Sequence, residues 1–403
     1  MQNLFQEQSV YKNTRNLTNL LIVCLLLFLS SNNKTLYASK EPIIRVLIAK
    51  EKILRVRADG KMPLIFSYKD FFNKKVKGLT LKRKDNSTIM FFDKNKSKIY
   101  NIKEDKGLII KSFDKRGIWV GGKRYSGVIN IFNMNNQIYV VNVIGIEKYL
   151  TSVVGSEMPH KWPLEALKAQ AIASRTYALR KIGNKIYDID STQRDQVYNG
   201  LESKTFRTNK AVKHTRSLVV TYKNKLVNAL FHSSSGGMTE NSENVWKNKY
   251  PYLVSTKDFD QDNPKLAWKK VFTAQELERL FPNIGGIQNI EILAITSTGR
   301  VKTLKLIGNY GKIELSGREL RKKMGLRSTL FRFNFLEDET HQDNYKNHNT
   351  NSSLLISGMG AGHGVGMSQW GARYMAIKGY KANQILKHFY KGIQIKPFKD
   401  IYK

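Results

Sequence analysis

The sequence has a single cysteine, Cys24, and it lies in an apolar stretch near the N-terminus. A chain cleaved after that stretch would carry no thiol, which excludes disulfide bonds and cysteine-ligated metal sites from the mature protein. Long hydrophobic runs are scarce as well. The stretch itself, residues 20–29, has ten apolar residues, too few to cross a bilayer comfortably at about 20 residues per crossing.

The first forty residues have the order of a signal peptide. Lys12 and Arg15 precede the apolar stretch, and polar residues 30–34 follow it. Ala38 is a candidate for the last residue of the signal, although Leu36 is larger than the small residue usual two positions earlier. We predict a signal peptide or short membrane anchor over residues 1–38. The protein would then be exported to the periplasm or cell envelope and meet the membrane only through an uncleaved leader.

Acidic residues are scarce relative to basic ones. There are 32 Asp and Glu against 68 Lys and Arg, a formal charge of +36. This surplus favours anionic partners such as nucleic acid, acidic lipid or anionic wall polymer, while a biased genome composition explains it equally well. Because the basic residues are spread along an exported chain, we expect no nucleic-acid partner.

The pattern of strands and turns predicts an α+β fold in two domains. Short strands with Gly-containing turns indicate a β-rich N-terminal domain over residues 39–136. A mixed α/β domain with a substrate cleft is predicted for residues 137–403. Its main helix should span residues 163–182, be buried, and have Pro163 at its first position. The other predicted elements are strands at 138–143, 218–222, 226–231, 290–295, 301–307 and 312–315, helices at 274–280, 317–324 and 381–390, and a polar loop at 338–353.

Three segments combine small, polar and aromatic residues in ways that packing alone does not require. They are residues 155–179 (GSEMPHKWPLEALKAQAIASRTYAL), 232–246 (HSSSGGMTENSENVW) and 358–372 (GMGAGHGVGMSQWGA), with DQVYNG at 195–200. We expect them to form one cleft.

These segments resemble stage II sporulation protein D and its relatives, which include amidase-enhancer proteins. The resemblance runs from about residue 138 to residue 393, and its most specific motifs are Glu-Met-Pro at 157–159 and Trp-Pro-x-Glu-Ala-Leu-Lys-Ala-Gln at 162–170. It implies a wall-facing protein, because characterised members look like lytic transglycosylases that cut peptide-stripped glycan strands. It also places the family's catalytic glutamate on Glu157. Sporulation as the biological occasion does not follow from it.

Glu157 could act as the acid of a glycan-cleaving reaction if its pKa is raised. Apolar neighbours such as Val153, Met158 and Trp162 would raise the pKa, whereas His160 and Lys161 would lower it, so the sign is open. A second acidic residue of similar motif quality is lacking, which favours a lytic mechanism with one carboxyl over hydrolysis with two. The alternative is that Glu157 only caps or faces the helix that starts near Pro163. Glu165 fits that role better.

Metal binding is the point where the sequence departs from the family pattern. The resemblance implies that some members bind a metal through cysteines near the Gln-Val-Tyr triplet, but here Asp195 precedes Gln196. Asp195 and His214 could ligate a metal only with other partners. We predict neither a metal nor a cofactor.

The run from His232 to Gly237 has two interpretations. Adjacent Ser and His, with glycines that could form an anion-binding nest, suggest a serine hydrolase. However, Gly-x-Ser-x-Gly is lacking, and neighbours on a strand point to opposite faces. We therefore interpret His232, Ser233 and Ser235 as saccharide-binding groups, with Trp246 or Tyr252 against a sugar ring or in the core.

Further substrate-binding candidates come from the other two segments and the triplet. His363 lies among the glycines of a loop that also contains Gln369, where it could orient substrate or Glu157. The remaining candidates are Gln170, Arg175, Gln196 and Tyr198; for each, the alternative is a buried, internally hydrogen-bonded group.

Two functions remain open at this point. The first is a lytic transglycosylase that cleaves MurNAc-GlcNAc bonds to 1,6-anhydro products. The second is a non-catalytic glycan-binding protein that enhances an N-acetylmuramoyl-L-alanine amidase. The expected partners are peptidoglycan strands and, for the second function, a cell-wall amidase.

Overall fold

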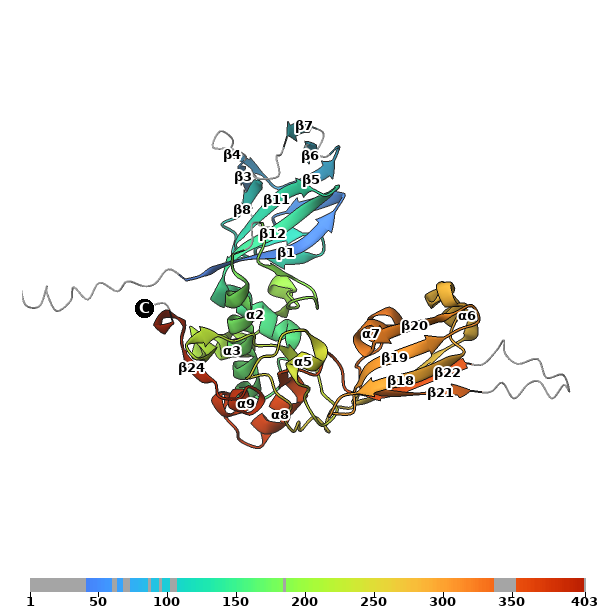
Figure 1. Ribbon diagram of the computed structural model, residues 1–403. Helices are drawn as coiled ribbons and strands as arrows, with labels where there is room; N and C mark the ends of the chain where they lie inside the picture. The colour runs from blue at the N-terminus through green and yellow to red at the C-terminus, as the bar shows by residue number, and fades with distance from the viewer. Residues whose placement is uncertain are drawn as a thin grey trace, which may run out of the picture. The chain divides into compact units, whose positions relative to one another are not determined.

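The computed structural model describes residues 41–59, 64–67, 73–85, 88–93, 96–101, 107–183, 186–336 and 353–401 (Figure 1). The leader predicted at residues 1–38, and all but the end of the polar loop predicted at 338–353, lie outside these residues. The fold is α+β, as predicted, with a strand-rich N-terminal region. Among the described residues, no helix is long and apolar enough to span a membrane.

The regular elements among the described residues of the N-terminal region are strands, which form two sheets. One has seven strands in the order β13-β1-β12-β11-β8-β3-β4, and the other has six in the order β10-β9-β2-β5-β6-β7. In β11, Ile129 and Ile131 are buried and alternate with more exposed residues, the period of two that a strand with one core face requires. The bounds are β1 (Ile43–Glu51), β2 (Ile53–Arg57), β3 (Leu64–Ser67), β4 (Asn73–Val76), β5 (Gly78–Arg83), β6 (Thr88–Asp93), β7 (Lys96–Asn101), β8 (Leu108–Lys111), β9 (Ile118–Val120), β10 (Lys123–Tyr125) and β11 (Val128–Met134).

Strand β12 (Gln137–Gly145) connects this region to the helices that follow. It pairs antiparallel with both β1 and β11, so the predicted boundary at residue 136 falls in the turn between two paired strands. Its residues 138–142 are all buried, as expected of a strand covered on both faces. β13 (Ile189–Asp190) adds a further strand beside β1. One hydrophobic core therefore runs from the sheets into the helices.

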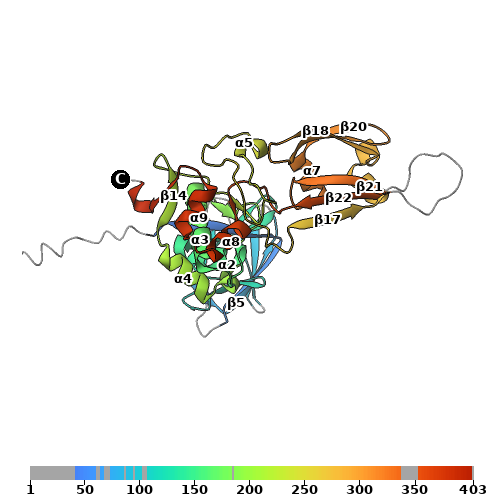
Figure 2. The same ribbon diagram turned by 90° about the horizontal axis from the view of Figure 1, so that it is seen from below.

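Helix α3 (Leu164–Lys181) is the centre of the helical part, and it is buried from Ala166 to Leu179 except at Lys168. Around it pack α2 (Ile146–Glu157), α4 (Phe206–His214), α8 (Gln369–Ile377) and α9 (Ala382–Phe389), and Figures 1 and 2 both show the C-terminal α8 and α9 against α3. The prediction of a buried helix is confirmed. Its start differs by one residue: Pro163 is the N-cap, and its carbonyl accepts the amides of Ala166 and Leu167.

Two small sheets complete this part. β14 (Leu218–Tyr222) pairs with β15 (Lys225–Leu226) and β24 (Gln394–Pro397), so the predicted hairpin is present. The prediction that its second strand continues to residue 231 is wrong. Phe231 instead begins β16 (Phe231–His232), which pairs parallel with β23 (Met367–Ser368). This pairing brings two of the three motif segments side by side.

Residues 267–359, called the insert below, have a hydrophobic core of their own. They form the sheets β17-β22-β21 and β18-β19-β20, which Figure 2 shows as separate layers. The strands and helices predicted here from residue 274 to residue 324 are confirmed. The bounds are β17 (Ala267–Phe272), α6 (Ala274–Leu280), η2 (Pro282–Ile284), β18 (Asn289–Ile295), β19 (Val301–Ile307), β20 (Lys312–Ser316), α7 (Gly317–Met324), β21 (Phe331–Leu336) and β22 (Ser353–Met359). Short helices outside the insert are η1 (Gly200–Ser203), α5 (Ser242–Val245) and η3 (Phe398–Asp400).

Candidate functional site

A cavity of about 1170 Å³ is lined by residues from all three motif segments and from the insert. The segments lie far apart in the sequence, so their meeting is a product of the fold. The lining residues are Ser156, Glu157, Tyr177, Arg180, Lys181, Gln193, Arg194, Asp195, Val197, Asn228, Leu230, Phe231, His232, Ser233, Trp246, Asn248, Tyr250, Arg318, Arg321, Leu326, Arg327, Ala361, Gly362, His363 and Gln369.

Glu157 reaches the cavity because α2 ends there. The residue before a proline is disfavoured in helical conformation, and Met158, which precedes Pro159, is extended at φ −130° and ψ 141°. The Met158 side chain is buried in the core and anchors the chain at this point. The Glu-Met-Pro triplet thus makes Glu157 the last helical residue, at the cavity wall.

The Glu157 carboxyl is half-buried and accepts two hydrogen bonds. The Val197 backbone N–H donates to Oε1 at 2.7 Å, and the Gln369 side-chain amide donates to Oε2 at 3.4 Å. Burial raises the pKa of Glu157 to about 7, against the opposing effect of these two hydrogen bonds. His160 and Lys161 are exposed, so solvent screens their charges. The balance that the sequence left open therefore gives a raised pKa, and both the protonated and the ionised forms of Glu157 are present near neutral pH.

Asp195 is the other carboxylic residue in the cavity wall, among the residues that the structure describes. Its Oδ1 accepts the Tyr177 hydroxyl at 2.6 Å and lies 3.2 Å from Lys181 Nζ. Its Oδ2 accepts the Asp190 N–H at 2.9 Å. Both oxygens are engaged by the protein, which makes Asp195 a poor partner for Glu157 in chemistry that needs two free carboxyls.

Two imidazoles and an indole form one group in the wall. The His363 ring centroid lies 5.5 Å from that of His232 and 5.1 Å from that of Trp246. Burial, with the nearby cations Arg321, Arg300 and Arg318, lowers the pKa of His363 to about 3, so its ring is neutral. Its Nδ1 accepts the Val365 N–H at 3.1 Å.

His232 is buried, and burial with neighbouring positive groups lowers its pKa. Its Nδ1 lies 3.1 Å from the Val365 carbonyl, which can only accept, so Nδ1 carries the proton. Its Nε2 is then an acceptor, and this atom has no hydrogen-bond partner in the described part of the chain.

Of the ten residues predicted for the site, the cavity wall contains Glu157, His232, Ser233, His363 and Gln369. Gln170 lies one step behind it, where its Oε1 accepts from Gln369 at 3.4 Å. Three others are held in the interior. Arg175 donates to both Glu147 oxygens at 2.9 and 2.7 Å, Gln196 accepts from Tyr149 at 3.0 Å, and Tyr198 donates to Asn142 at 2.8 Å.

The Ser-Gly-Gly run also uses its polar groups internally. Ser235 Oγ donates to Asp258 at 2.5 Å, away from the cavity. The N–H groups of Gly236 and Gly237 donate to the Asp260 carboxylate at 2.8 and 3.0 Å, so the anion in the predicted nest is the chain's own. Of the two aromatic candidates, Trp246 lines the cavity, whereas Tyr252 is buried and accepts the Asn228 N–H.

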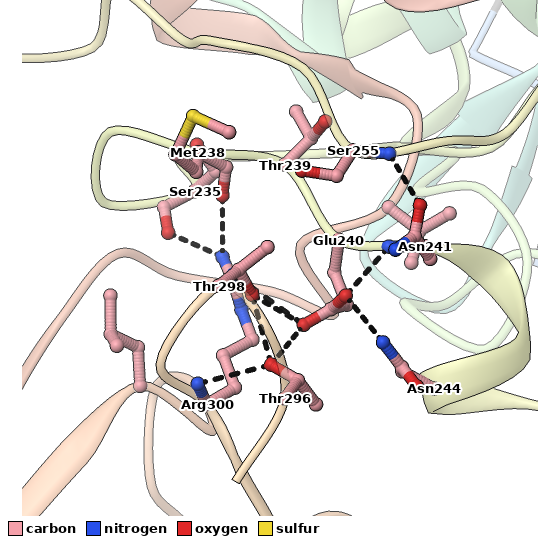
Figure 3. Close-up of polar contacts among 12 residues, drawn as sticks. Ser235, Met238, Thr239, Glu240, Asn241, Asn244, Ser255, Thr296, Thr298 and Arg300 are labelled. Atoms are coloured by element: carbon pink, nitrogen blue, oxygen red, sulfur yellow. Dashed lines mark hydrogen bonds and ion pairs between the residues drawn. The ribbon is translucent and has the colours of Figure 1, made fainter.

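A buried polar network joins the insert to the loop that follows His232 (Figure 3). Glu240 accepts hydrogen bonds from the hydroxyls of Thr296 and Thr298 and from Asn241 and Asn244. Arg300 lies 3.9 Å from Glu240 and donates to the carbonyls of Ser235 and Met238 at 2.5 and 3.0 Å. These contacts fix the turn between β18 and β19 against the loop that forms one wall.

The positive charge of the cavity was not predicted from the sequence. Six of its lining residues are basic: Arg180, Lys181, Arg194, Arg318, Arg321 and Arg327. The only available signal was the i, i+3 spacing of Arg318 and Arg321 on a predicted helix, which puts both on one face. In so basic a chain, that spacing is common on solvated faces.

No metal site is apparent in the described ranges, where no group of three or more His, Cys, Asp or Glu could hold an ion. His214 is the last residue of α4 and is exposed, so it does not line the cavity with Asp195. The absence of a metal or cofactor stays a prediction.

Comparison with known proteins relates two parts of the chain to families. Residues 134–222 match the model described as "Stage II sporulation protein", and residues 240–366 match a domain of unknown function, DUF8618. Glu157 lies in the first match, and Arg318 and Arg321 lie in the second.

Three relatives indicate how far the similarity extends. The chain is 35% identical over 288 residues to stage II sporulation protein D of Bacillus subtilis, covering 66% of this chain and 78% of that protein. It is 29% identical over 373 residues to an uncharacterized protein of Brachyspira hyodysenteriae, covering 88% and 96%. It is 31% identical over 329 residues to the amidase enhancer of Bacillus subtilis, covering 68% of this chain but 44% of that protein.

Proposed function

Because this chain belongs to the stage II sporulation protein D family, we propose that it acts on the bacterial cell wall, as an exported lytic transglycosylase that cleaves peptidoglycan glycan strands. The observation that carries the proposal is the state of Glu157: a carboxyl at a cavity wall whose pKa burial raises to about 7. General acid–base catalysis works best when the pKa of the group is near the working pH. The predicted leader supports a location in the periplasm or cell envelope.

The proposed reaction needs one carboxyl and no water. Protonated Glu157 donates its proton to the glycosidic oxygen between MurNAc and GlcNAc, and the bond from that oxygen to C1 breaks. The carboxylate then takes the proton of the muramic acid 6-hydroxyl as O6 bonds to C1, which leaves a 1,6-anhydro end. Glu157 finishes protonated, as it began.

Two neighbours of Glu157 fit this cycle. The N–H of Val197 and the amide of Gln369 both donate to the carboxyl, and such donors stabilise the carboxylate formed midway. Asp195 is engaged by Tyr177, Lys181 and Asp190. The one-carboxyl mechanism therefore suits the cavity better than hydrolysis with a second carboxylate activating water.

A second candidate function is glycan binding that enhances a cell-wall amidase. It is favoured by the 31% identity to a relative named amidase enhancer, although the chain spans 44% of that protein. In this alternative, Glu157 and the polar wall would hold a glycan strand without cleaving it.

The test is mass spectrometry of glycan fragments released from amidase-treated peptidoglycan by the chain without its predicted leader. Wild type should give anhydro-ended fragments, and Glu157→Gln should give none. Glu165→Gln is the matched control, because Glu165 pairs with Lys168 and does not line the cavity, so it should retain activity. Fragments with ordinary reducing ends would contradict the lytic mechanism. Intact glycan with all three proteins, together with retained binding, would favour the enhancer.

A further inference from the structure

Helix α7 of the insert directs two arginines at the cavity that contains Glu157. Arg318 and Arg321 are three residues apart, which places them on one face of the helix, and both line the cavity. The position of α7 is fixed where it starts. A Cβ on Gly317 would come within 2.1 Å of the Val301 carbonyl, so this glycine lets α7 lie directly against β19. The arginines are thus presented by a supported element.

These arginines form no ion pair among the described residues, although the charge of Arg318 acts on neighbouring Glu319. No carboxylate forms an ion pair with Arg318, Arg321 or Arg327, whereas Arg300 of the same insert has Glu240. Arg321 is half-buried, and its Nε donates only to the Leu326 carbonyl at 3.3 Å. Arg327 donates to the Lys265 carbonyl at 2.7 Å. Each guanidinium has further N–H donors that these contacts leave open.

The two α7 arginines also repel each other. Burial first, and then the charge of Arg318, lower the pKa of Arg321. Holding like charges together beside a cavity is unfavourable unless an anion enters between them. The surroundings are otherwise suited to a sugar, because Arg318 lies 6.0 Å over the Trp246 ring, and Trp246 contacts His363.

We propose that Arg318 and Arg321 form a subsite that binds a carboxylate of the substrate. This subsite is separate from Glu157, the group that transfers protons in the proposed reaction. A guanidinium pairs with a carboxylate through two parallel hydrogen bonds, which gives both affinity and orientation. The carboxylate that a glycan strand itself carries is the lactyl group of muramic acid, and it is free only where the stem peptide has been removed. With the peptide attached, the same position is a neutral, bulky amide.

The identity of the ligand as a cell-wall glycan rests on the proposed function. The subsite itself does not require that the glycan be cleaved. The subsite would select peptide-free muramic acid equally in an enzyme and in a glycan-binding enhancer. The anionic phosphate of a wall polymer shares the required chemistry, and the experiment separates the two sources.

The experiment is titration calorimetry with the chain that carries Glu157→Gln, so that no ligand is cleaved. The ligands are a GlcNAc-MurNAc tetrasaccharide with free lactyl carboxylates, the same tetrasaccharide with those carboxylates converted to methylamides, chitotetraose, and a glycerol phosphate oligomer. A second protein carries Arg318→Gln and Arg321→Gln together in addition to Glu157→Gln. Lys322→Gln is the control, because Lys322 is exposed on the same helix and does not line the cavity.

The double arginine change should weaken binding of the free carboxylate form roughly tenfold or more, since charged hydrogen bonds are lost. Affinity for the methylamide form and chitotetraose should not change, and Lys322→Gln should have no effect. Equal weakening for every ligand, or none for the carboxylate form, would overturn the subsite. If the arginine changes weakened binding of the phosphate oligomer alone, the lactyl carboxylate of muramic acid would not be the anion that the subsite binds. Carboxylate selectivity in this titration, together with a wild-type chain that releases no anhydro-ended fragments, would contradict only the lytic proposal. Fragment release by the wild-type chain without carboxylate selectivity would contradict only the subsite.

Discussion

The side chains of Gln369 and Glu157 are 212 positions apart in the sequence, yet the Gln369 amide nitrogen lies 3.4 Å from a Glu157 carboxyl oxygen. The same nitrogen lies 3.4 Å from Gln170 Oε1 on α3, which sets its direction. The first residue of α8 therefore influences the protonation of a group at the end of α2.

Replacing Gln369 should change the pH dependence of the proposed reaction. The Gln369 hydrogen bond lowers the pKa of Glu157, so Gln369→Ala should raise it. Since the first step needs protonated Glu157, the alkaline limb of the activity profile should move to higher pH, and peak activity should fall about two- to tenfold. The measurement is the rate of fragment release as a function of pH. The control is Gln384→Ala, because the Gln384 side chain is exposed on α9 and does not line the cavity. An unmoved alkaline limb would contradict the assignment.

Ionisation of the Glu157 carboxyl at alkaline pH should lower the free energy of unfolding. Its pKa of about 7 in the fold exceeds the ordinary 4.5, so the folded chain holds a proton that the unfolded chain releases between these values. The stability associated with that proton is fully present below pH 4.5 and is lost as pH rises through 7. A shift of this size corresponds to at most about 3 kcal/mol.

Glu157→Gln removes this titration and should therefore be more stable than wild type at pH 8. The two proteins should approach each other in stability as the pH falls towards 5. Urea unfolding at both pH values measures the difference. A wild type that is the more stable protein at pH 8 would show that the carboxylate is better solvated than the fold suggests.

Much of the fold followed from local patterns in the sequence. The strand predicted at 301–307 and the buried helix predicted at 163–182 rest on local patterns of apolar residues, and both were confirmed. The direction of polar side chains was not predictable in the same way. Gln196 and Tyr198 flank Val197 in one triplet, and both point inward to Tyr149 and Asn142, while the atom that contacts Glu157 is the backbone N–H of Val197. A backbone donor leaves no signal in residue type.

The arginines of the insert were missed for a different reason. The sequence shows that Arg318 and Arg321 share a helix face, but it does not show that the face meets a cavity or that no carboxylate lies opposite. Both facts depend on the packing of α7 against β19, more than 140 residues after Glu157 in the chain. Lack of a partner is a property of the folded state.

Arg175 should contribute to stability through Glu147. The two side chains form an ion pair at 2.7 Å, with exposures of 1% and 13%. Removing one partner of a buried pair leaves the other charge uncompensated, so Arg175→Met should cost about 3–5 kcal/mol in the free energy of unfolding. Adding Glu147→Leu should recover part of that loss.

Urea unfolding of the single and double variants measures this coupling. Arg124→Met is the matched control, because its pair with Glu202 has exposures of 33% and 41% and should be worth less than about 1 kcal/mol. If Arg175→Met instead left stability unchanged and weakened glycan binding, Arg175 would act on substrate, as the sequence suggested.

Gly155 should be a position where alanine, normally the better helix former, destabilises the protein. Alanine in a helix interior is favoured over glycine by about 1 kcal/mol. In α2, however, a Cβ on Gly155 would lie 2.0 Å from the Ser203 carbonyl of η1, which is backbone and cannot rotate away. Relief requires α2 to move, and overpacking of this kind costs about 1–3 kcal/mol.

That movement would displace Glu157, which follows Gly155 by two residues in the last turn of α2. Gly155→Ala should therefore lower both the free energy of unfolding and the rate of glycan cleavage, and it should weaken the hydrogen bond that Val197 donates to Glu157. Thr151→Ala in the same helix is the control and should be neutral or slightly stabilising, since its hydroxyl only bonds back to the Lys148 carbonyl. A stable and fully active Gly155→Ala protein would mean that α2 can shift without moving Glu157, and that the contact with Ser203 does not position the acid.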